Sequence, residues 1–187
     1  LLHKYKNKSR AWLALGIDNK LSDIGESHGG SGKSFMYESL HQILRNPFTI
    51  PGRKKEVVDS EFIYGGVTKD TDNIFIDDIL PGYDYGRIYT DITGPMRVNN
   101  KGVNAFTLTF DESAKLCGTS NFTPRDYNNP STKRRLLLTV HSDYYHENKD
   151  NEYKQTRTIA DDFGGMQLFT DFTEQDYLDF YALMAQC

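Results

Sequence analysis

A run of small residues that ends in lysine and serine is the part of this chain best suited to chemistry. Residues 27–34 read Ser-His-Gly-Gly-Ser-Gly-Lys-Ser and follow the pattern G-x-x-x-x-G-K-[ST], except that Ser27 replaces the first glycine. Glycine enters the region of positive φ freely, so such a run lets backbone N–H groups curl round a phosphate. The lysine adds charge at the β- and γ-phosphates, and the last hydroxyl reaches Mg²⁺. We therefore predict a nucleoside triphosphate site formed by Ser27, His28, Gly29, Gly30, Ser31, Gly32, Lys33 and Ser34.

Two acidic residues follow an apolar run further along the chain. Asn73-Ile-Phe-Ile leads directly into Asp77 and Asp78, and open α/β sheets bind ligands at the carboxyl ends of their strands. Hydrolysis of a nucleotide needs a held Mg²⁺ and an aligned water. We expect Asp77 to hold Mg²⁺ together with Ser34, and Asp78 to polarise the water. The alternative is a solvated pair of acids in a turn.

The second half of the chain carries further groups that suit phosphate chemistry. A short apolar run ends at Asn121, whose amide can hold the attacking water or sense the γ-phosphate. The basic segment Lys133-Arg134-Arg135 follows, and guanidinium groups bind phosphate in a bidentate manner. An arginine finger stabilises the charge that develops in phosphoryl transfer. Either Arg134 or Arg135 is the expected finger, and a basic patch at the start of a strand is the alternative.

The elements that must position these residues alternate between strand-like and helix-like patterns. Helices are expected over residues 35–44, 85–92 and 173–187, and strands over residues 11–17, 21–24, 61–64, 73–76, 116–120 and 136–141. Residues 96–110 alternate in polarity around Asn99-Asn100-Lys101-Gly102, which predicts a β-hairpin. This order predicts an α/β fold with a central, mostly parallel sheet flanked by helices.

Length and composition limit the classes of protein that fit. The chain has 187 residues and a formal net charge of −4, so nucleic acid could be bound only through a local basic surface. No apolar run approaches the roughly 18 residues of a membrane helix, and two cysteines are too few for a disulfide framework. We expect one domain over residues 1–187, in a reducing cytoplasm and without a membrane partner. Because the chain lacks an initial Met, we also expect it to be part of a longer protein.

Taken in order, these motifs resemble the superfamily 3 helicases of small DNA viruses, phages and plasmids. Lys33 and Ser34 resemble that family's Walker A residues, Asp77 and Asp78 its Walker B residues, and Asn121 its sensor 1. The likeness covers about residues 11–140 and is closest to the helicase part of phage-type primase–helicases. Residues 141–187 match no motif. The family implies an AAA+-like P-loop core with an inserted β-hairpin, and ATP and Mg²⁺ as ligands.

The resemblance also implies partners. The segment from residue 92 to residue 102 is similar to the family motif whose hairpin touches DNA in a central channel, with Lys101 at the tip and Arg97 near the base. The family works as a ring, usually a hexamer, in which Arg134 would reach the neighbour's nucleotide. The implied activity is ATP-driven movement along single-stranded or forked DNA. A primase or origin-binding domain is the expected companion in the full-length protein.

Three other functions remain open at this stage. The chain could be a different ATP-driven motor, which remodels protein or packages DNA. It could be an assembly module that binds ATP and hardly hydrolyses it, because Asp78 stands where related ATPases carry glutamate. A small-molecule kinase is the third, although no residues suggest an acceptor pocket. The sequence does not distinguish DNA from RNA and does not fix the number of subunits or the direction of movement.

Overall fold

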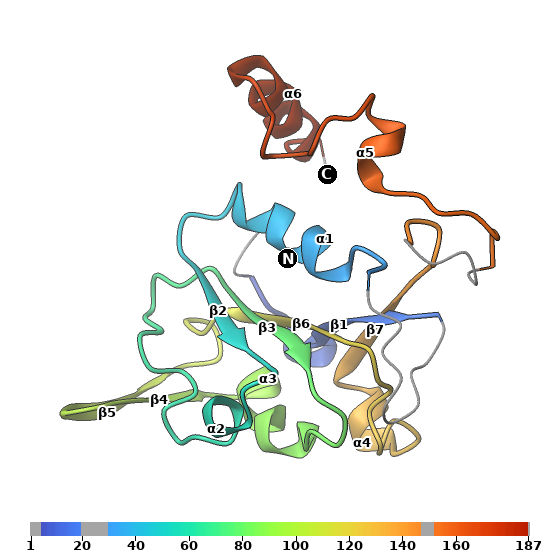
Figure 1. The fold of residues 1–187 in the computed structure, drawn as a ribbon. Coiled ribbons are helices and arrows are strands. Elements are labelled where there is room, and N and C mark those ends of the chain that lie inside the picture. Colours follow the sequence, from blue (N-terminus) through green and yellow to red (C-terminus); the bar gives the residue numbers. More distant parts are fainter. Residues whose placement is uncertain (1–4, 20–29, 147–151, 187) are drawn as a thin grey trace.

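A five-stranded parallel sheet forms the centre of the protein, whose computed structural model describes residues 5–19, 30–146 and 152–186. Its strands lie in the order β2-β3-β6-β1-β7, and every neighbouring pair is parallel. The strands are β1 (Leu13–Asp18), β2 (Pro47–Pro51), β3 (Asn73–Ile79), β6 (Lys115–Ser120) and β7 (Leu136–His141). Because all five run the same way, their carboxyl ends meet at one edge of the sheet (Figure 1).

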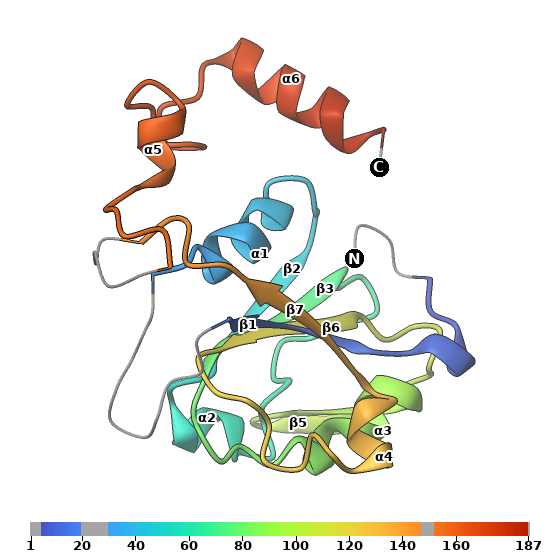
Figure 2. The ribbon, with the colours of Figure 1, turned by 90° about the vertical axis from the view of Figure 1, so that its right-hand side faces the viewer.

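Helices cover both faces of the sheet. The helix α1 (Lys33–His41) lies on one face, and α2 (Lys55–Val58), α3 (Tyr89–Thr93) and α4 (Pro130–Lys133) lie on the other (Figure 2). There are also two short 3-10 helices: η1 (Lys8–Arg10), which precedes β1, and η2 (Tyr85–Ile88), which runs directly into α3. Beyond α1 lie α5 (Ile159–Asp162) and α6 (Glu174–Met184). No helix in the described part of the chain is both long and apolar enough to cross a membrane.

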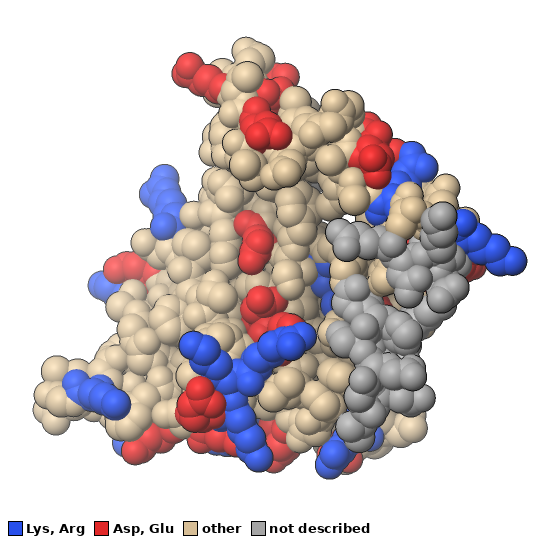
Figure 3. Space-filling model, in the orientation of Figure 1, with Lys and Arg blue, Asp and Glu red and all other residues tan. Residues whose placement is uncertain are grey.

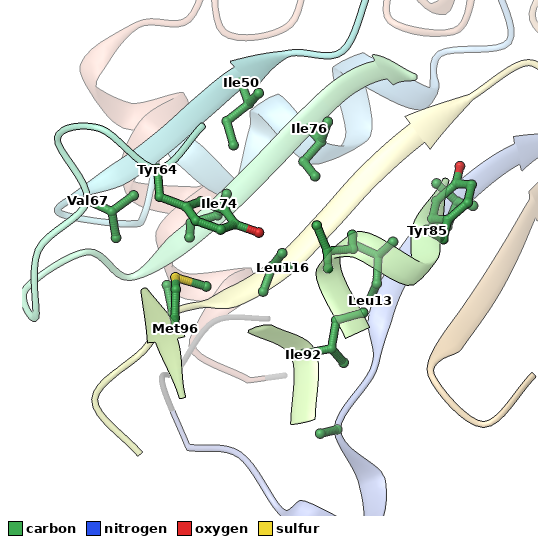
Figure 4. Packing of buried hydrophobic residues seen from close by; sticks show 14 of the residues in the cluster. Leu13, Ile50, Tyr64, Val67, Ile74, Ile76, Tyr85, Ile92, Met96 and Leu116 are labelled. Atoms are coloured by element: carbon green, nitrogen blue, oxygen red, sulfur yellow. The ribbon is translucent and has the colours of Figure 1, made fainter. Parts of the chain in front are cut away.

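The core divides between the two faces because successive strand residues point to opposite sides. Leu13, Leu15 and Ile17 of β1 belong to the larger buried cluster, while the intervening Ala14 packs with Tyr37 of α1 in a smaller one. Figure 4 shows side chains of the larger cluster, from the central strands, Met96 and the α3 residue Ile92, converging below the sheet. The face under α1 is filled by Ala14, Tyr37, Phe75 and Cys117.

An antiparallel hairpin stands apart from the main sheet. It consists of β4 (Met96–Asn100) and β5 (Val103–Leu108), joined by Lys101 and Gly102, with Gly102 at a φ of +75°. Its base is anchored by Met96, Val98 and Leu108, which are buried, whereas residues 101–107 are exposed. The hairpin therefore projects from the body of the molecule (Figure 1).

The sequence predicted the longer helices, the hairpin and four strands of the sheet, but it missed β2 and the short helices α2, α4 and α5, and one predicted strand is wrong. The predicted sheet, hairpin and terminal helix are confirmed, and Thr173 and Asp176 form the expected capping box of α6. The strand predicted over residues 61–64 is wrong: the chain turns there, with the Gly65 amide donating to the Phe62 carbonyl at 2.8 Å. The edge strand β2 was not predicted because it begins and ends with proline, a residue that only edge strands tolerate. The strand predicted over residues 21–24 lies outside the described residues.

Candidate functional site

Three neighbouring strands deliver polar residues to the same edge of the sheet. Asp18 is the last residue of β1, and Asn121 follows β6 directly. Asp77 and Asp78 lie near the carboxyl end of β3, just before its last residue. These strands are adjacent in the order β3-β6-β1, and α1 begins at Lys33 beside them. Residues from distant parts of the sequence therefore share one small region, as expected for the carboxyl ends of parallel strands.

A glycine turn leads into α1. Gly30 and Gly32 adopt φ values of +109° and +79°, a backbone conformation that side chains disfavour, and Gly32 is the residue that precedes the helix. The first N–H groups of a helix have no partner within it, and its N-terminus carries partial positive charge. The turn and the helix start thus form a surface suited to an anion. Ser27, His28 and Gly29, which the sequence assigns to the same loop, lie outside the described residues.

Lys33 is held by a carboxylate that sequence analysis did not select. Its Nζ donates to Asp18 Oδ2 at 2.5 Å, and both side chains are almost fully buried, with 7% and 4% exposure. The Ser31 hydroxyl also donates to Asp18 and lies 3.3 Å from Lys33 Nζ. Across the strand pair, His141 stands opposite Asp18, and burial together with the nearby Lys33 lowers the pKa of His141. The only sequence signal for Asp18 is its place at the end of the strand that precedes the loop.

One carboxylate oxygen of Asp77 is in hydrogen-bond contact with two hydroxyl groups. Ser34 Oγ donates to Asp77 Oδ1 at 2.7 Å, and Thr119 Oγ1 lies 3.0 Å from the same atom. Thr119 also accepts the Asp78 backbone N–H at 2.8 Å, so this buried threonine of β6 fixes the end of β3. Serine hydroxyl and carboxylate oxygens are ligands that Mg²⁺ prefers. Ser34 and Asp77 therefore fit the role of Mg²⁺ ligands predicted for them.

Asp78 lies in an irregular part of β3. The pairing with β6 shifts between Ile76 and Ile79, and Asp78 adopts a φ of +56°. Aspartate is among the few residues with a side chain that occupy this region with some frequency. The irregularity separates the two acids, so that Asp77 contacts Ser34 while Asp78 contacts Arg53.

Arg53 is a second residue of the site that the sequence motifs did not indicate. Its Nε donates to the Asp78 carboxylate. The preceding Gly52 makes this approach possible: its amide donates to the Asp77 carbonyl at 2.6 Å, and a Cβ there would lie 2.5 Å from the same oxygen. Arg53 becomes part of the site through this close contact between the end of β2 and the end of β3. No local pattern in the sequence indicates that contact.

These groups surround a cavity of about 320 Å³. Its lining includes the glycines of the turn, the cations Lys33 and Arg53, and the polar residues Ser34, Asp78, Thr119 and Asn121. The cavity combines a helix N-terminus, the Asn121 amide and two cations that are each paired with a carboxylate, Lys33 with Asp18 and Arg53 with Asp78. Such a set can bind an anion and place an acidic group beside it.

The two arginines predicted as fingers lie elsewhere. Both precede β7, whose first residue Leu136 pairs with Leu13, so they lie at the amino-terminal edge of the sheet. Arg135 donates to the Ser131 carbonyl at 2.9 Å and stacks on the Tyr89 ring at 4.8 Å. Arg134 is exposed, and its side chain makes no hydrogen bond or ion pair with the described residues. The structure does not bring either arginine to the site of its own chain.

The predicted DNA contacts lie on the projecting hairpin. Arg97 on β4 and Lys101 at the turn are both exposed, and Arg97 Nε donates to Asn99 Oδ1 at 3.1 Å. On the face drawn in Figure 3, basic and acidic side chains are interspersed, and a basic side chain lies on the projection formed by the hairpin.

Comparison with known proteins supports the fold. No protein-family model and no curated protein sequence matches this chain. Among solved structures, the A form apo structure of the C-terminal region of NrS-1 is similar, with a TM-score of 0.51 and 15% sequence identity. The match covers 92% of this chain but 34% of that chain, so this chain spans about a third of it. At this identity the likeness concerns the fold alone.

Proposed function

We propose that this chain is an ATP-dependent DNA helicase or translocase core of the superfamily 3 type. The observation that carries the proposal is the convergence of Lys33, Ser34, Asp77, Asp78 and Asn121 on one edge of the sheet, where all but Asp77 line the small cavity and Asp77 contacts Ser34. These residues come from three separate segments, and each has a chemical role in nucleotide hydrolysis. A chance glycine-rich turn would not account for the other segments.

ATP would bind with its phosphates against the glycine turn and the start of α1. The ammonium group of Lys33 has three N–H donors. It could therefore keep its hydrogen bond to Asp18 and donate the others to the β- and γ-phosphates. Ser34 and Asp77 would hold Mg²⁺, which supplies positive charge to the phosphate oxygens. Thr119 would keep Asp77 in place through its contact at 3.0 Å.

Hydrolysis would use the carboxylate of Asp78 and the amide of Asn121, which both line the cavity. Asp78 accepts a proton from the attacking water, and Asn121 orients that water toward the γ-phosphorus. The bond from water oxygen to phosphorus forms as the bond from phosphorus to the bridging oxygen breaks, which leaves ADP and phosphate. Arg53 pairs with Asp78 in the absence of nucleotide. An incoming γ-phosphate offers Arg53 a second anionic partner and frees Asp78 for water.

A ring would complete the site. Arg134 lies at the opposite edge of the sheet from Lys33, exposed and unbonded among the described residues, so it can serve only the nucleotide of a neighbouring copy. The projecting hairpin would carry Lys101 and Arg97 into the centre of the ring. Phosphate contacts from a few such residues suffice for binding of single-stranded DNA.

A second function is favoured by one observation, the ion pair between Arg53 and Asp78. If this pair persists when ATP is bound, Asp78 cannot accept a proton from water. The chain would then bind ATP to hold an assembly together and would hydrolyse it very slowly. The two functions differ in turnover and share the binding of ATP.

Unwinding of a forked DNA duplex tests the proposal. A helicase separates the strands only with ATP and Mg²⁺, and Asp78→Asn abolishes separation while ATP still binds. Rapid ATP hydrolysis without any strand separation would point to another kind of motor. Binding of ATP with negligible turnover and no unwinding would favour the assembly module.

A further inference from the structure

A second, larger cavity adjoins the candidate phosphate site. It measures about 900 Å³ and shares Gly30, Gly32 and Phe35 with the smaller cavity of about 320 Å³. The two spaces therefore meet at the glycine turn. Their sizes lie within the range of small-molecule sites in proteins, roughly 300–1,000 Å³. One ligand could extend from the first cavity into the second.

The remaining wall of the larger cavity comes from the C-terminal segment, namely Tyr145, His146 and residues within 157–170, in which the sequence shows no motif. This segment lies directly over the turn: a Cβ on Gly32 would meet Ile159 Cδ1 at 3.8 Å, and a Cβ on Gly30 would meet the His146 ring at 4.0 Å. The Phe169 ring packs on Phe35 of α1, with centroids 5.5 Å apart. The segment is thus attached to the helix that begins the phosphate site.

The chemistry of the larger cavity differs from that of the smaller one. Its lining includes the rings of Phe35 and Tyr145 and the apolar side chains of Ile159, Met166 and Leu168. Arg157, which also lines it, is neutralised: its Nε donates to Asp162 Oδ1 at 3.0 Å.

Asp162 also holds the aromatic wall in place. The Tyr145 hydroxyl donates to its Oδ2 at 2.9 Å, so one carboxylate joins Tyr145 to the guanidinium of Arg157. The guanidinium in turn stacks on Tyr144 at 4.8 Å. A cavity lined by these rings and apolar side chains, with polar side chains such as His146 and Gln167 among them, suits a flat ring system with hydrogen-bonding edges better than a phosphate.

We propose that Tyr145, His146 and residues 157–170 form the nucleoside-binding half of the ATP site, with the base and ribose in the larger cavity and the triphosphate in the smaller one. The inference rests on the proposed function, because it places a nucleotide at the glycine turn. It assigns a role to the C-terminal segment that its sequence does not indicate. Tyr145 and Leu168 are the side chains that would contact the nucleoside.

The test compares two ligands that share phosphates and differ in the nucleoside. Binding of MgATP and of inorganic tripolyphosphate is measured by calorimetry on the wild-type chain and on Tyr145→Ala and Leu168→Ala. Loss of one well-packed ring or side chain costs about 1.4 kcal/mol, which is tenfold in affinity. We expect each variant to bind ATP about tenfold more weakly and to bind tripolyphosphate like the wild type.

A matched control is Phe163→Ala, which removes a half-exposed ring of the same segment that lines neither cavity. It should bind both ligands like the wild type. Thermal melting checks that each variant is folded, and Leu168→Ala replaces Tyr145→Ala if the latter is not.

Three results would overturn the inference. If the variants lose ATP and tripolyphosphate equally, the segment acts on the phosphates or on folding. If they bind ATP like the wild type while Lys33→Ala does not, the nucleoside lies elsewhere and the proposed function stands. If the wild-type chain binds neither ligand, the proposed function itself fails.

Discussion

Lys33 and Asp18 form an ion pair that is more than nine-tenths buried at the centre of the candidate site. Removal of one partner from such a pair leaves an uncompensated charge away from water, which is more costly than the pair is stabilising. Lys33, which we propose binds the γ-phosphate, therefore also contributes to the stability of the protein without nucleotide. Variants at this position change folding as well as binding.

We predict that Lys33→Ala lowers the free energy of unfolding by about 3 kcal/mol, because Asp18 loses its cation. The double variant Lys33→Met with Asp18→Asn should recover most of that loss. Urea denaturation measures both, with the exposed Lys101→Ala as the matched control. A Lys33→Ala variant no less stable than Lys101→Ala would contradict the buried pair.

At the residue scale, sequence could predict the residues that carry a local pattern and no others. Lys33 and Ser34 stand in a recognisable motif, and Asp77 follows an apolar strand, so their adjacency at one sheet edge was foreseeable. Asp18, Arg53 and Thr119 join the site only through strand order and the close approach at Gly52. Such contacts are tertiary, and no short stretch of sequence carries them.

Among the elements, the β4–β5 hairpin is the one in which residues proposed to bind DNA can be changed with the least effect on the stability of the fold. Residues 101–107 are exposed, and a Cβ on Gly102 would meet nothing within 4 Å. Changes at the tip should therefore leave the core unaltered. This separation makes the hairpin a clean site for testing contact with DNA.

We expect Lys101→Ala to weaken binding of single-stranded DNA and its stimulation of ATP turnover, with ATP binding unchanged. The loss of one phosphate contact reduces the slope of log affinity against log salt by about 0.7 for each subunit. Fluorescence anisotropy over a salt series measures it. Arg45→Ala, an exposed basic residue away from the hairpin, controls for net charge. Equal effects of the two variants would show that the hairpin does not touch DNA.

The helix α3 carries a half-buried acid, Asp91, whose titration affects stability. Burial raises the pKa of Asp91 to about 6, although its hydrogen bond from the Tyr64 hydroxyl and the charge of Lys6 oppose the shift. An unfolded aspartate has a pKa of about 3.9. The folded state therefore holds this proton more tightly, and the stabilisation is complete below about pH 4 and lost as the pH rises through 6.

The free energy of unfolding should accordingly fall by up to about 3 kcal/mol from this group between pH 4 and pH 6.5. Asp91→Asn, which cannot ionise, should remove that part of the decline. Chemical denaturation at several pH values measures the difference. Identical pH slopes for the wild type and Asp91→Asn would mean that the carboxyl is not buried as described.

Element boundaries followed from pattern where the pattern was strong. The runs that became β1, β3, β6 and β7 are apolar and bounded by polar residues, and the capping box of α6 was legible in Thr173 and Asp176. The β2 strand carries proline at both ends, and residues 61–64 bury Tyr64 from a turn rather than from a strand. In both places the local sequence pattern favoured another structure, and packing against the rest of the fold decided the conformation of the chain.

For the whole molecule, Arg134 and Lys33 lie at opposite edges of the sheet, so in the proposed ring each site would take its Arg134 from a neighbouring chain. Arg134→Ala alone and Lys33→Ala alone should both lack turnover in the proposed ring. A mixture of the two variants should regain part of the activity, because some interfaces then pair an intact Lys33 with an intact Arg134. Arg135→Ala, whose side chain already stacks on Tyr89, distinguishes the two arginines. A mixture as inactive as its components would contradict a shared site.

Steady-state ATP hydrolysis, with and without single-stranded DNA, tests the central claim most directly. It is measured over a range of protein concentrations beside Lys33→Ala, with folding of each sample checked by circular dichroism. Turnover that rises with DNA and with protein concentration, and that vanishes in the folded variant, is the predicted result. Turnover that persists in Lys33→Ala, or a wild-type chain that neither binds nor hydrolyses ATP, would contradict a nucleotide site at this edge of the sheet.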